Sequence, residues 1–204
     1  MKLYYKPGAC SQATHITLQE LGLNHELDRV EQETGKTDSG QDFTQVSPNG
    51  YVPALQLDDG QVLTEGPAIL QYLADQHPNS DLSPAPGTVE RARMQSVLTF
   101  VSSELHPGFR AFYLNPNLAG EEREQAEAGL AKRFDYLESL LGDGQDFLTS
   151  KTFTIADAYG FVVSSWAPRV GFDLKPWPKV RAFVERVRAR PSVQAALGAE
   201  GLLA

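Results

Sequence analysis

Residues 52–67 read VPALQLDDGQVLTEGP, and this stretch decides which fold the first part of the chain adopts. Residues 54–57 and 61–63 are short β-prone runs that flank the turn Asp58-Asp59-Gly60. Two such runs around a turn of this kind are typical of an antiparallel hairpin. Pro67 then stands at an early helical position, where its missing N–H costs nothing. The stretch therefore predicts a β-hairpin followed by a helix over residues 67–76.

The chain before this stretch predicts a βαβ unit. Residues 2–5 form a β-prone run, residues 16–21 lie in a helical pattern, and a second extended run surrounds residues 25–30. The segment 78–87 carries three prolines and few large apolar groups, which is typical of an exposed linker. We therefore expect an α/β domain over residues 1–77 and a linker over 78–87.

Beyond the linker, the apolar period is helical almost throughout. Helices are expected over residues 89–105, 121–141, 155–168 and 180–190, with a short tail helix after Pro191. We therefore expect an all-helical domain over residues 88–204, so the fold class is α/β followed by all-α.

Composition excludes several kinds of partner. The 204 residues are 41% hydrophobic, but no apolar run approaches the roughly 20 residues of a spanning helix, so no membrane contact is expected. A net charge of −8 opposes nucleic-acid binding.

The start of the chain lacks a signal or transit pattern, and one cysteine fits a reducing compartment, so a cytoplasmic protein is expected. The histidines and Cys10 lack metal-ligand spacing, and no metal is expected.

Cys10 lies in the segment 7–11, between the first predicted strand and the first predicted helix. Free backbone N–H groups and the helix dipole at such a position favour an anion, including a thiolate. Cys10 is therefore placed to be reactive or to face a reactive thiol. Its position is equally compatible with a small buried apolar residue, because lone cysteines often take that role.

Two further motifs offer backbone groups to a ligand. A proline that enters a strand, as Pro53 does, is a candidate for a cis peptide bond, although base rates favour trans. A cis bond would turn the N–H and C=O of Val52 outward, towards an extended peptide ligand. The helix start at residues 64–67 offers free N–H groups to a carboxylate. Glu65 belongs to that site or is a first-turn acid favoured by the helix dipole.

These three motifs, in this order and ahead of a helical domain, resemble the glutathione transferases, and the bacterial beta class in particular. The resemblance also covers residues 2–11, His106 and residues 153–159, and so spans essentially the whole chain. It implies a thioredoxin-like βαβ-ββα domain with a cis peptide before Pro53, then a C-terminal helical bundle. It also implies a homodimer with its sites near the subunit interface.

The resemblance implies which residues of the first domain bind glutathione. Val52 would pair with the cysteinyl backbone, and Glu65 with Gly66 would hold the γ-glutamyl end. Cys10 would lie beside the glutathione sulfur. Lys36 is the expected contact of the glycyl end, in a segment where the alignment has no firm anchor.

In the helical part, Thr99, Ser103 and His106 are spaced at i, i+4 and i+7, so they project from one face of a helix. Periodicity alone is also typical of a solvated face. The beta class usually has serine and histidine at 103 and 106, which makes this face a wall of the site. It commonly has asparagine where Thr99 stands and lysine where Pro107 stands, and Pro107-Gly108 is expected to kink or end the helix. The expected glutathione-binding residues are Tyr5, Cys10, Lys36, Val52, Pro53, Glu65, Gly66, Thr99, Ser103 and His106.

The tyrosines of the first strand and the capping box near residue 154 are not expected to be catalytic. Strand alternation is expected to bury one of Tyr4 and Tyr5, and the beta class does not rely on a catalytic tyrosine, so Tyr5 is a candidate contact only. Thr154 and Asp157 match a capping box at the start of a helix, which is a structural role.

The resemblance implies an enzyme that conjugates the glutathione thiol to small hydrophobic electrophiles. A thiol with a pKa near ~8.5 is only a few per cent ionised at neutral pH, so groups that lower this pKa increase the thiolate. The expected groups are Cys10, Ser11 and His106. Two alternatives stay open: a thiol transferase that forms a mixed disulfide at Cys10, and a ligand-binding protein with little catalysis. The electrophile pocket is expected to draw on Phe109, Phe112, Tyr113 and Trp166, unless these are core or interface residues.

Overall fold

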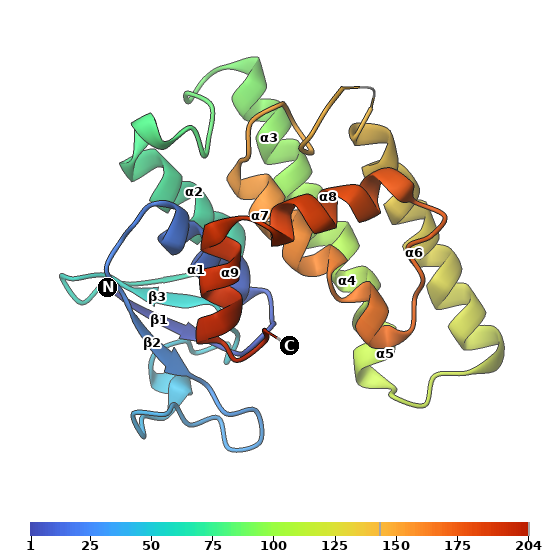
Figure 1. Ribbon diagram of the computed structural model, residues 1–204. Coiled ribbons are helices and arrows are strands. Elements are labelled where there is room, and N and C mark those ends of the chain that lie inside the picture. Colours follow the sequence, from blue (N-terminus) through green and yellow to red (C-terminus); the bar gives the residue numbers. More distant parts are fainter. Residues whose placement is uncertain (143, 204) are drawn as a thin grey trace. The chain divides into compact units, whose positions relative to one another are not determined.

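The computed structural model describes residues 1–142 and 144–203. The chain divides into two compact units, both drawn in Figure 1. The first combines Met1–Ser83 with the chain from Ala189 onward, and the second is Pro84–Arg188. The first unit is α/β and the second is helical, which confirms the predicted fold class.

A four-stranded mixed sheet forms the centre of the first unit. Its strands are β1 (Lys2–Tyr5), β2 (Glu26–Arg29), β3 (Ala54–Gln56) and β4 (Val62–Thr64), in the spatial order β2-β1-β3-β4. β1 pairs parallel with β2 and antiparallel with β3, which pairs antiparallel with β4. With α1 (Ser11–Glu20) and α2 (Gly66–Gln76), this gives the βαβ-ββα order of the thioredoxin-like fold. The predicted hairpin is therefore confirmed.

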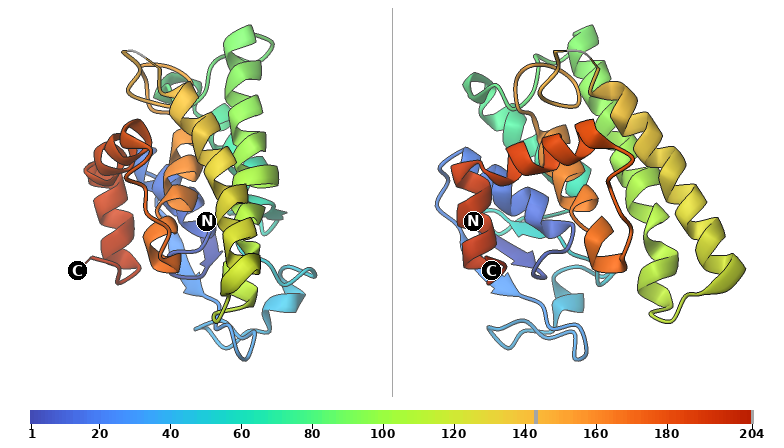
Figure 2. Two further views of the ribbon diagram at one scale, coloured as in Figure 1. Left: turned by 90° about the vertical axis from the view of Figure 1, so that its right-hand side faces the viewer. Right: turned by 45° about the vertical axis from the view of Figure 1, so that its right-hand side comes forward.

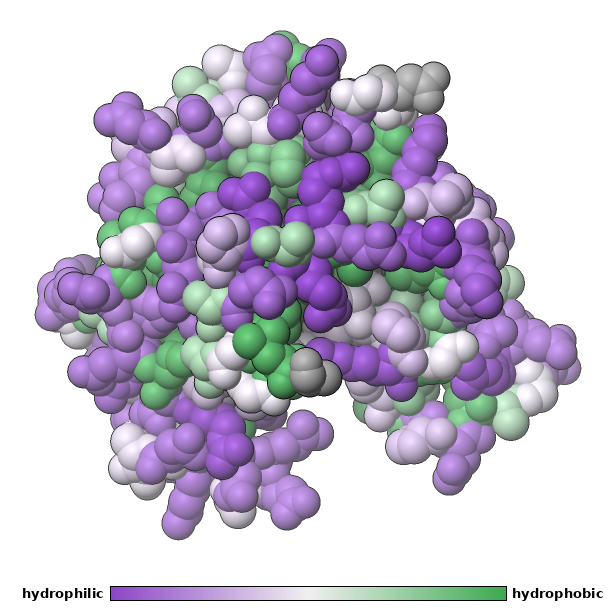
Figure 3. Space-filling model, in the orientation of Figure 1, coloured by the Kyte–Doolittle hydropathy of each residue, from purple (hydrophilic) through white to green (hydrophobic). Residues whose placement is uncertain are grey.

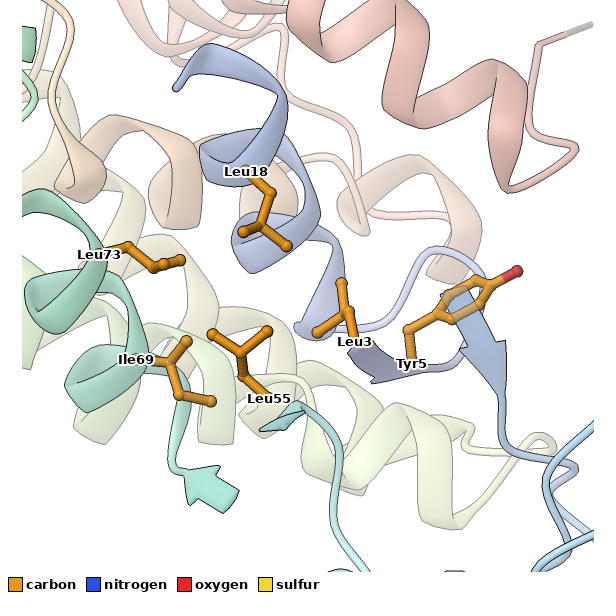
Figure 4. Close-up of a cluster of buried hydrophobic side chains, with 6 residues drawn as sticks. All are labelled: Leu3, Tyr5, Leu18, Leu55, Ile69 and Leu73. Atoms are coloured by element: carbon orange, nitrogen blue, oxygen red, sulfur yellow. The ribbon is translucent and has the colours of Figure 1, made fainter. Parts of the chain in front are cut away.

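Apolar side chains fill the space between one face of the sheet and the two helices. Leu3 and Leu55 come from the strands, Leu18 from α1, and Ile69 and Leu73 from α2; Figure 4 shows these side chains facing one another. All five are at most 1% exposed. Burying such a side chain contributes about 1.5–3 kcal/mol, so this cluster holds α1 and α2 on the sheet.

Tyr4 and Tyr5 are both buried, whereas strand alternation was expected to bury only one of them. Tyr5 belongs to the cluster of Figure 4. Tyr4 points to the other face of the sheet, where its ring lies 5.7 Å from that of Phe43. Phe43 begins a short 3-10 helix, Phe43–Gln45, that covers this face. Neither tyrosine is exposed because both faces of β1 are covered.

The tail helix α9 (Pro191–Ala199) belongs to the first unit, although the sequence analysis grouped it with the helical domain. It packs along α1, and the two helices lie side by side in Figure 1. Arg190 fixes its start, because its guanidinium donates to both carboxylate oxygens of Glu20, at 2.6 and 2.9 Å. Helical periodicity shows that a helix has an apolar face but does not show which partner covers it.

The second unit is built from helices, and Figure 2 shows α3 and α6 side by side. The helix α7 is buried along its whole length and packs against α3 and α8. Its start carries the predicted capping box of Thr154 and Asp157, which is confirmed. The helices are α3 (Val89–Phe100), α4 (His106–Gly108), α5 (Arg110–Leu114), α6 (Gly120–Leu140), α7 (Ile155–Ser164) and α8 (Pro178–Arg188).

A π-helical turn at Val101–Leu105 separates α3 from α4. Pro107 has no N–H to donate to the preceding turn, and a widened turn accommodates this loss. The helix is then interrupted at Phe109, so the interruption expected after His106 is present. A Cβ at Gly108 would lie 3.0 Å from side-chain carbons of α6, so glycine at this position lets α4 approach α6 closely.

Hydrophilic residues predominate on the face shown in Figure 3, with apolar residues scattered among them. The helix α6 has 21 residues, but its sequence GEEREQAEAGLAKRFDYLESL is strongly charged. No helix in the described part of the chain is both long enough and apolar enough to cross a membrane.

Candidate functional site

The loop before α1 brings Cys10 to Val52. Cys10 occupies the N-cap position of α1 and is partly exposed. Its S–H donates to the Val52 carbonyl oxygen, with an S···O distance of 3.2 Å. Two of the motifs that the sequence analysis identified separately therefore meet in the first unit.

The third motif lies against the second. The peptide bond between Val52 and Pro53 is cis, as the resemblance implies. A Cβ placed on Gly66 would lie 3.8 Å from Pro53 Cγ, so the start of α2 contacts this proline. Glu65 precedes α2 with φ 67° and ψ 110°, a conformation that residues other than glycine rarely adopt. Such outliers cluster at functional sites, and this one adjoins the cis peptide.

Burial raises the pKa of the Cys10 thiol to about 11. The backbone N–H groups of Ser11 and Cys10 oppose this rise, while the negative charge of Glu65 adds to it and the charge of Lys6 opposes it. At neutral pH the Cys10 side chain is therefore a neutral thiol. In this state its S–H is available as a hydrogen-bond donor, and it donates to the Val52 carbonyl oxygen.

We expect Cys10 to react slowly with iodoacetamide at neutral pH. With a pKa of about 11, the thiolate fraction at pH 7 is on the order of a hundredfold lower than that of an ordinary cysteine with a pKa near ~8.5. The alkylation rate, followed by mass spectrometry, should rise with pH up to about 11. The urea-unfolded chain is a matched control, since Cys10 is its only thiol. A rate in the folded protein that levels off below pH 9 would contradict this assignment.

The Ser11 hydroxyl closes the loop that carries Cys10. Its Oγ accepts from the Lys6 N–H at 3.2 Å and donates to the Lys6 carbonyl at 3.3 Å. The side chain is fully buried. The hydroxyl thus donates one hydrogen bond and accepts one in shaping the loop, and its action on a ligand thiol stays a prediction.

Glu200 supports the same loop, and the sequence analysis missed it. This residue follows α9, and its side chain is fully buried. Its Oε2 accepts from the Gly8 N–H at 2.8 Å and from Gln12 Nε2 at 2.9 Å, and its Oε1 lies 2.9 Å from His15 Nδ1. The only signal in the sequence was one acidic residue within the apolar tail AALGAEGLLA.

Lys36 and Tyr5 are two other expected binding residues of the first unit, and they lie in different surroundings from Cys10 and Val52. Lys36 is exposed, and its backbone pairs with Asp42. The ring of Tyr5 lies in the core, 6.4 Å from that of His15. Within the described chain, neither side chain hydrogen-bonds to Cys10 or Val52, and the proposed contacts of both stay predictions.

Thr99, Ser103 and His106 lie in the second unit. Thr99 and Ser103 are exposed, and the Ser103 hydroxyl donates to the Thr99 carbonyl at 2.9 Å. His106 is partly buried, and its Nδ1 lies 2.7 Å from the hydroxyl of Tyr159 in α7. Burial lowers the pKa of His106, which favours its neutral imidazole. Tyr159, which orients this ring, was not among the expected site residues.

Aromatic rings surround His106. The Trp166 ring lies edge-on to that of His106 at 4.8 Å, and it also contacts Phe109 and Tyr113 at 5.7 and 5.8 Å. Trp166 and Phe109 are buried, whereas Tyr113 is 51% exposed. Of these candidates for an electrophile pocket, Tyr113 is therefore the one that presents substantial surface.

Comparison with known proteins identifies the family. Residues 8–76 match the model of the glutathione S-transferase N-terminal domain, and residues 98–191 match that of the C-terminal domain. Glutathione S-transferase GstA of Escherichia coli O157:H7 is 43% identical over 99% of this chain and 100% of the relative.

Two solved structures have the same fold over the whole chain. One is a bacterial beta class glutathione S-transferase from Sphingomonas chungbukensis, with 42% identity and a TM-score of 0.92 over 100% of both chains. The other is a sphingomonad glutathione S-transferase complexed with glutathione, with the same identity, coverage and TM-score. This chain belongs to the glutathione S-transferase family and is similar to its bacterial beta class.

Proposed function

We propose that this protein binds glutathione in its first unit and conjugates the thiol to small hydrophobic electrophiles. The observation that carries the proposal is the meeting of Cys10 with the cis Val52-Pro53 peptide, next to the start of α2. Membership of the glutathione S-transferase family and a similar structure that contains glutathione support it.

The proposed binding mode uses backbone groups first. An extended tripeptide pairs its cysteinyl backbone with Val52, whose carbonyl oxygen has a second lone pair besides the one that Cys10 uses. The γ-glutamyl end lies at Glu65 and Gly66, where the N-terminus of α2 offers free N–H groups. Lys36 meets the glycyl carboxylate. The contacts of Thr99, Ser103 and His106 with glutathione are proposed from the family resemblance.

The proposed reaction is a thiol addition or substitution. The glutathione S–H passes its proton to solvent water, and the sulfur uses the freed electron pair to form a bond to an electrophilic carbon. A leaving group then departs with its bonding electrons, or a double bond takes up a proton. The Cys10 S–H turns from the Val52 carbonyl to the glutathione sulfur when the ligand is bound, and this hydrogen bond lowers the pKa of the glutathione sulfur.

The protonation state of Cys10 favours conjugation over thiol transfer. A mixed disulfide needs Cys10 to attack, or to be attacked, as a good thiolate or leaving group. Burial raises the pKa of Cys10 to about 11, which makes it poor in both roles at neutral pH.

Replacing Cys10 by alanine should therefore retain most conjugation activity. We expect kcat/KM with a reactive aryl halide to fall by less than about tenfold, the factor that corresponds to one lost hydrogen bond. Cys10→Ser, which keeps a donor, is the matched control and should lose less. Loss of nearly all turnover in Cys10→Ala, together with glutathione-dependent disulfide reductase activity in the unchanged protein, would favour the thiol transferase instead.

Isothermal titration calorimetry tests the binding step itself. The pure folded protein should release or absorb heat on titration with glutathione at millimolar concentration. Absence of any heat would contradict the proposal, and binding without turnover of aryl halides would favour a ligand-binding role.

Two further parts of the proposal rest on the family. We propose a homodimer, which sedimentation velocity would report as about twice the 22.4 kDa chain mass, and a cytoplasmic location. Residues 1–77 are proposed as the glutathione-binding domain, 78–87 as the linker and 88–204 as the helical domain, with α9 packing on the first of these.

A further inference from the structure

A carboxylate is buried beneath the loop that carries Lys36. Asp28 lies on β2 opposite Tyr4 of β1, so its side chain points to the face of the sheet that Phe43 covers. The side chain of Asp28 is only 4% exposed. Burying a carboxylate is unfavourable unless hydrogen bonds compensate for the water that it loses. The partners of Asp28 therefore indicate its role.

Both carboxylate oxygens of Asp28 bind Ser39, which lies eleven residues further along the chain. Oδ1 accepts from the Ser39 N–H at 3.1 Å, and Oδ2 accepts from the Ser39 hydroxyl at 2.6 Å. Lys2 of β1 is a weaker partner, because its Nζ lies 3.9 Å from Asp28 Oδ2 and 3.7 Å from Glu26. The main contacts of this carboxylate are thus with the loop rather than with the neighbouring strand.

The hydrogen bonds continue from Ser39 towards Lys36. The Ser39 hydroxyl gives its only proton to Asp28, so in its 2.8 Å contact with Thr37 it accepts from the Thr37 hydroxyl. Thr37 Oγ1 in turn accepts from the Gln41 N–H at 3.2 Å, and the Thr37 N–H donates to the Gln41 carbonyl at 2.9 Å. Hydrogen bonds that form a chain of this kind strengthen one another. Asp28 therefore fixes the turn that directly follows Lys36.

The other side of Lys36 is attached to the surroundings of Val52. The carbonyl of Gly35, the preceding residue, accepts from the Phe43 N–H at 3.0 Å. Phe43 belongs to a cluster of buried side chains against which Val52 packs. The loop is therefore held on one side by β2 and on the other by the segment to which the cysteinyl part of glutathione is proposed to bind.

We propose that Asp28 is a positioning residue for glutathione, which holds the backbone at Lys36 so that the lysine ammonium meets the glycyl carboxylate. The inference rests on the proposed function and adds a residue that does not touch the ligand. Asp28 is buried and the Lys36 side chain is exposed, so Asp28 acts through the backbone of residues 36–39. A backbone that is already fixed lowers the entropy that binding costs. Loss of Asp28 should weaken binding of the glycyl end without changing the reaction of bound glutathione.

Two ligands that differ only at the glycyl carboxylate test this proposal. One is glutathione, and the other is its glycyl monoethyl ester, in which this group is uncharged. We expect Asp28→Ala to raise the dissociation constant of glutathione about fivefold, the effect of one exposed charged contact, and to leave that of the ester unchanged. The kcat with a reactive aryl halide at saturating glutathione should also stay unchanged. Equal losses for the two ligands would overturn the proposal, because they would reveal a general loosening of the fold.

Ser39→Ala tests the same connection from the loop. Ser39 is exposed, and the change removes its hydroxyl while Asp28 stays in place, so this variant decides the matter if Asp28→Ala does not fold. It should weaken binding of glutathione but not of the ester. Asp38→Ala is the matched control, because Asp38 is an exposed acid of the same loop that pairs with Arg29 at 3.3 Å. The control should bind glutathione as the unchanged protein does. Equal affinities of Ser39→Ala and Asp38→Ala for glutathione would overturn the proposal.

A double-mutant cycle separates this inference from the proposed function. Lys36→Ala should weaken glutathione binding about fivefold, and adding Asp28→Ala should then have no further effect, because Asp28 acts through Lys36. Additive losses would overturn the positioning role and leave the Lys36 contact standing. Unchanged affinity in Lys36→Ala would overturn both the contact and this inference. Absence of glutathione binding by the unchanged protein would overturn the proposed function itself, and this inference with it.

Discussion

Replacing Asp157 by alanine should lower the free energy of unfolding of the helical unit by about 3 kcal/mol, the scale of a lost buried hydrogen-bond network. The Asp157 carboxyl is fully buried and accepts three hydrogen bonds. These come from the Leu148 N–H at 2.7 Å and from the Thr154 N–H and hydroxyl, each at 2.8 Å. The change leaves three buried donors unpaired at the start of α7, the helix that is buried along its whole length.

Urea unfolding followed by tryptophan fluorescence measures this loss. Both tryptophans, Trp166 and Trp177, lie in the helical unit, so their emission reports on it. Asp146→Ala is the matched control, because Asp146 is exposed and its carboxylate forms a surface ion pair with Arg186 at 3.4 Å. That pair is worth less than about 1 kcal/mol. Equal midpoints for the two variants would show that the capping box does not stabilise the unit.

Replacing Glu200 by alanine should destabilise the first unit by about 3 kcal/mol, since buried polar partners are left without an acceptor. The Gly8 N–H, Gln12 and His15 all lose the carboxylate that they share. Gly8 lies in the loop that leads to Cys10, so the glutathione KM should rise as the loop loosens. Glu200→Gln keeps one acceptor oxygen and should lose less than the alanine variant.

Far-UV circular dichroism in urea and a glutathione titration measure the two effects. Glu33→Ala is a suitable control, because Glu33 is an exposed acidic residue of the same unit. Surface changes of this kind usually alter stability by less than about 0.5 kcal/mol. If the KM and the unfolding midpoint of Glu200→Ala equal those of Glu33→Ala, the buried carboxylate does not hold the loop.

The sequence predicted the sheet and most helices because their signals are local. The turn at residues 58–60 marks the hairpin, and proline placement marks the start of α2. The burial of both Tyr4 and Tyr5 was missed because a strand's alternation does not reveal that both faces are covered. The π turn before Pro107 was missed for a similar reason, since sequence indicates that a helix is disturbed but not how the backbone adapts.

The sequence predicted those residues of the candidate site that stand in recognisable motifs. Cys10, Val52 and Glu65 stand in recognisable contexts, and the structure brings their segments together. Glu200 lies in no recognisable motif. Its role depends on contacts with Gly8, Gln12 and His15, which precede it in the sequence by 192, 188 and 185 positions. Which residues come into contact across such a separation depends on tertiary packing, and local sequence patterns do not reveal it.

The placement of α9 bears on how the protein matures during synthesis. The loop before α1 leaves the ribosome before the helical unit, and its buried acceptor, Glu200, leaves after that unit. The α/β unit of a nascent chain is therefore completed only after the helical unit has emerged. A chain halted before this tail would expose the side of α1 that α9 covers and would be an expected target for chaperones or proteases.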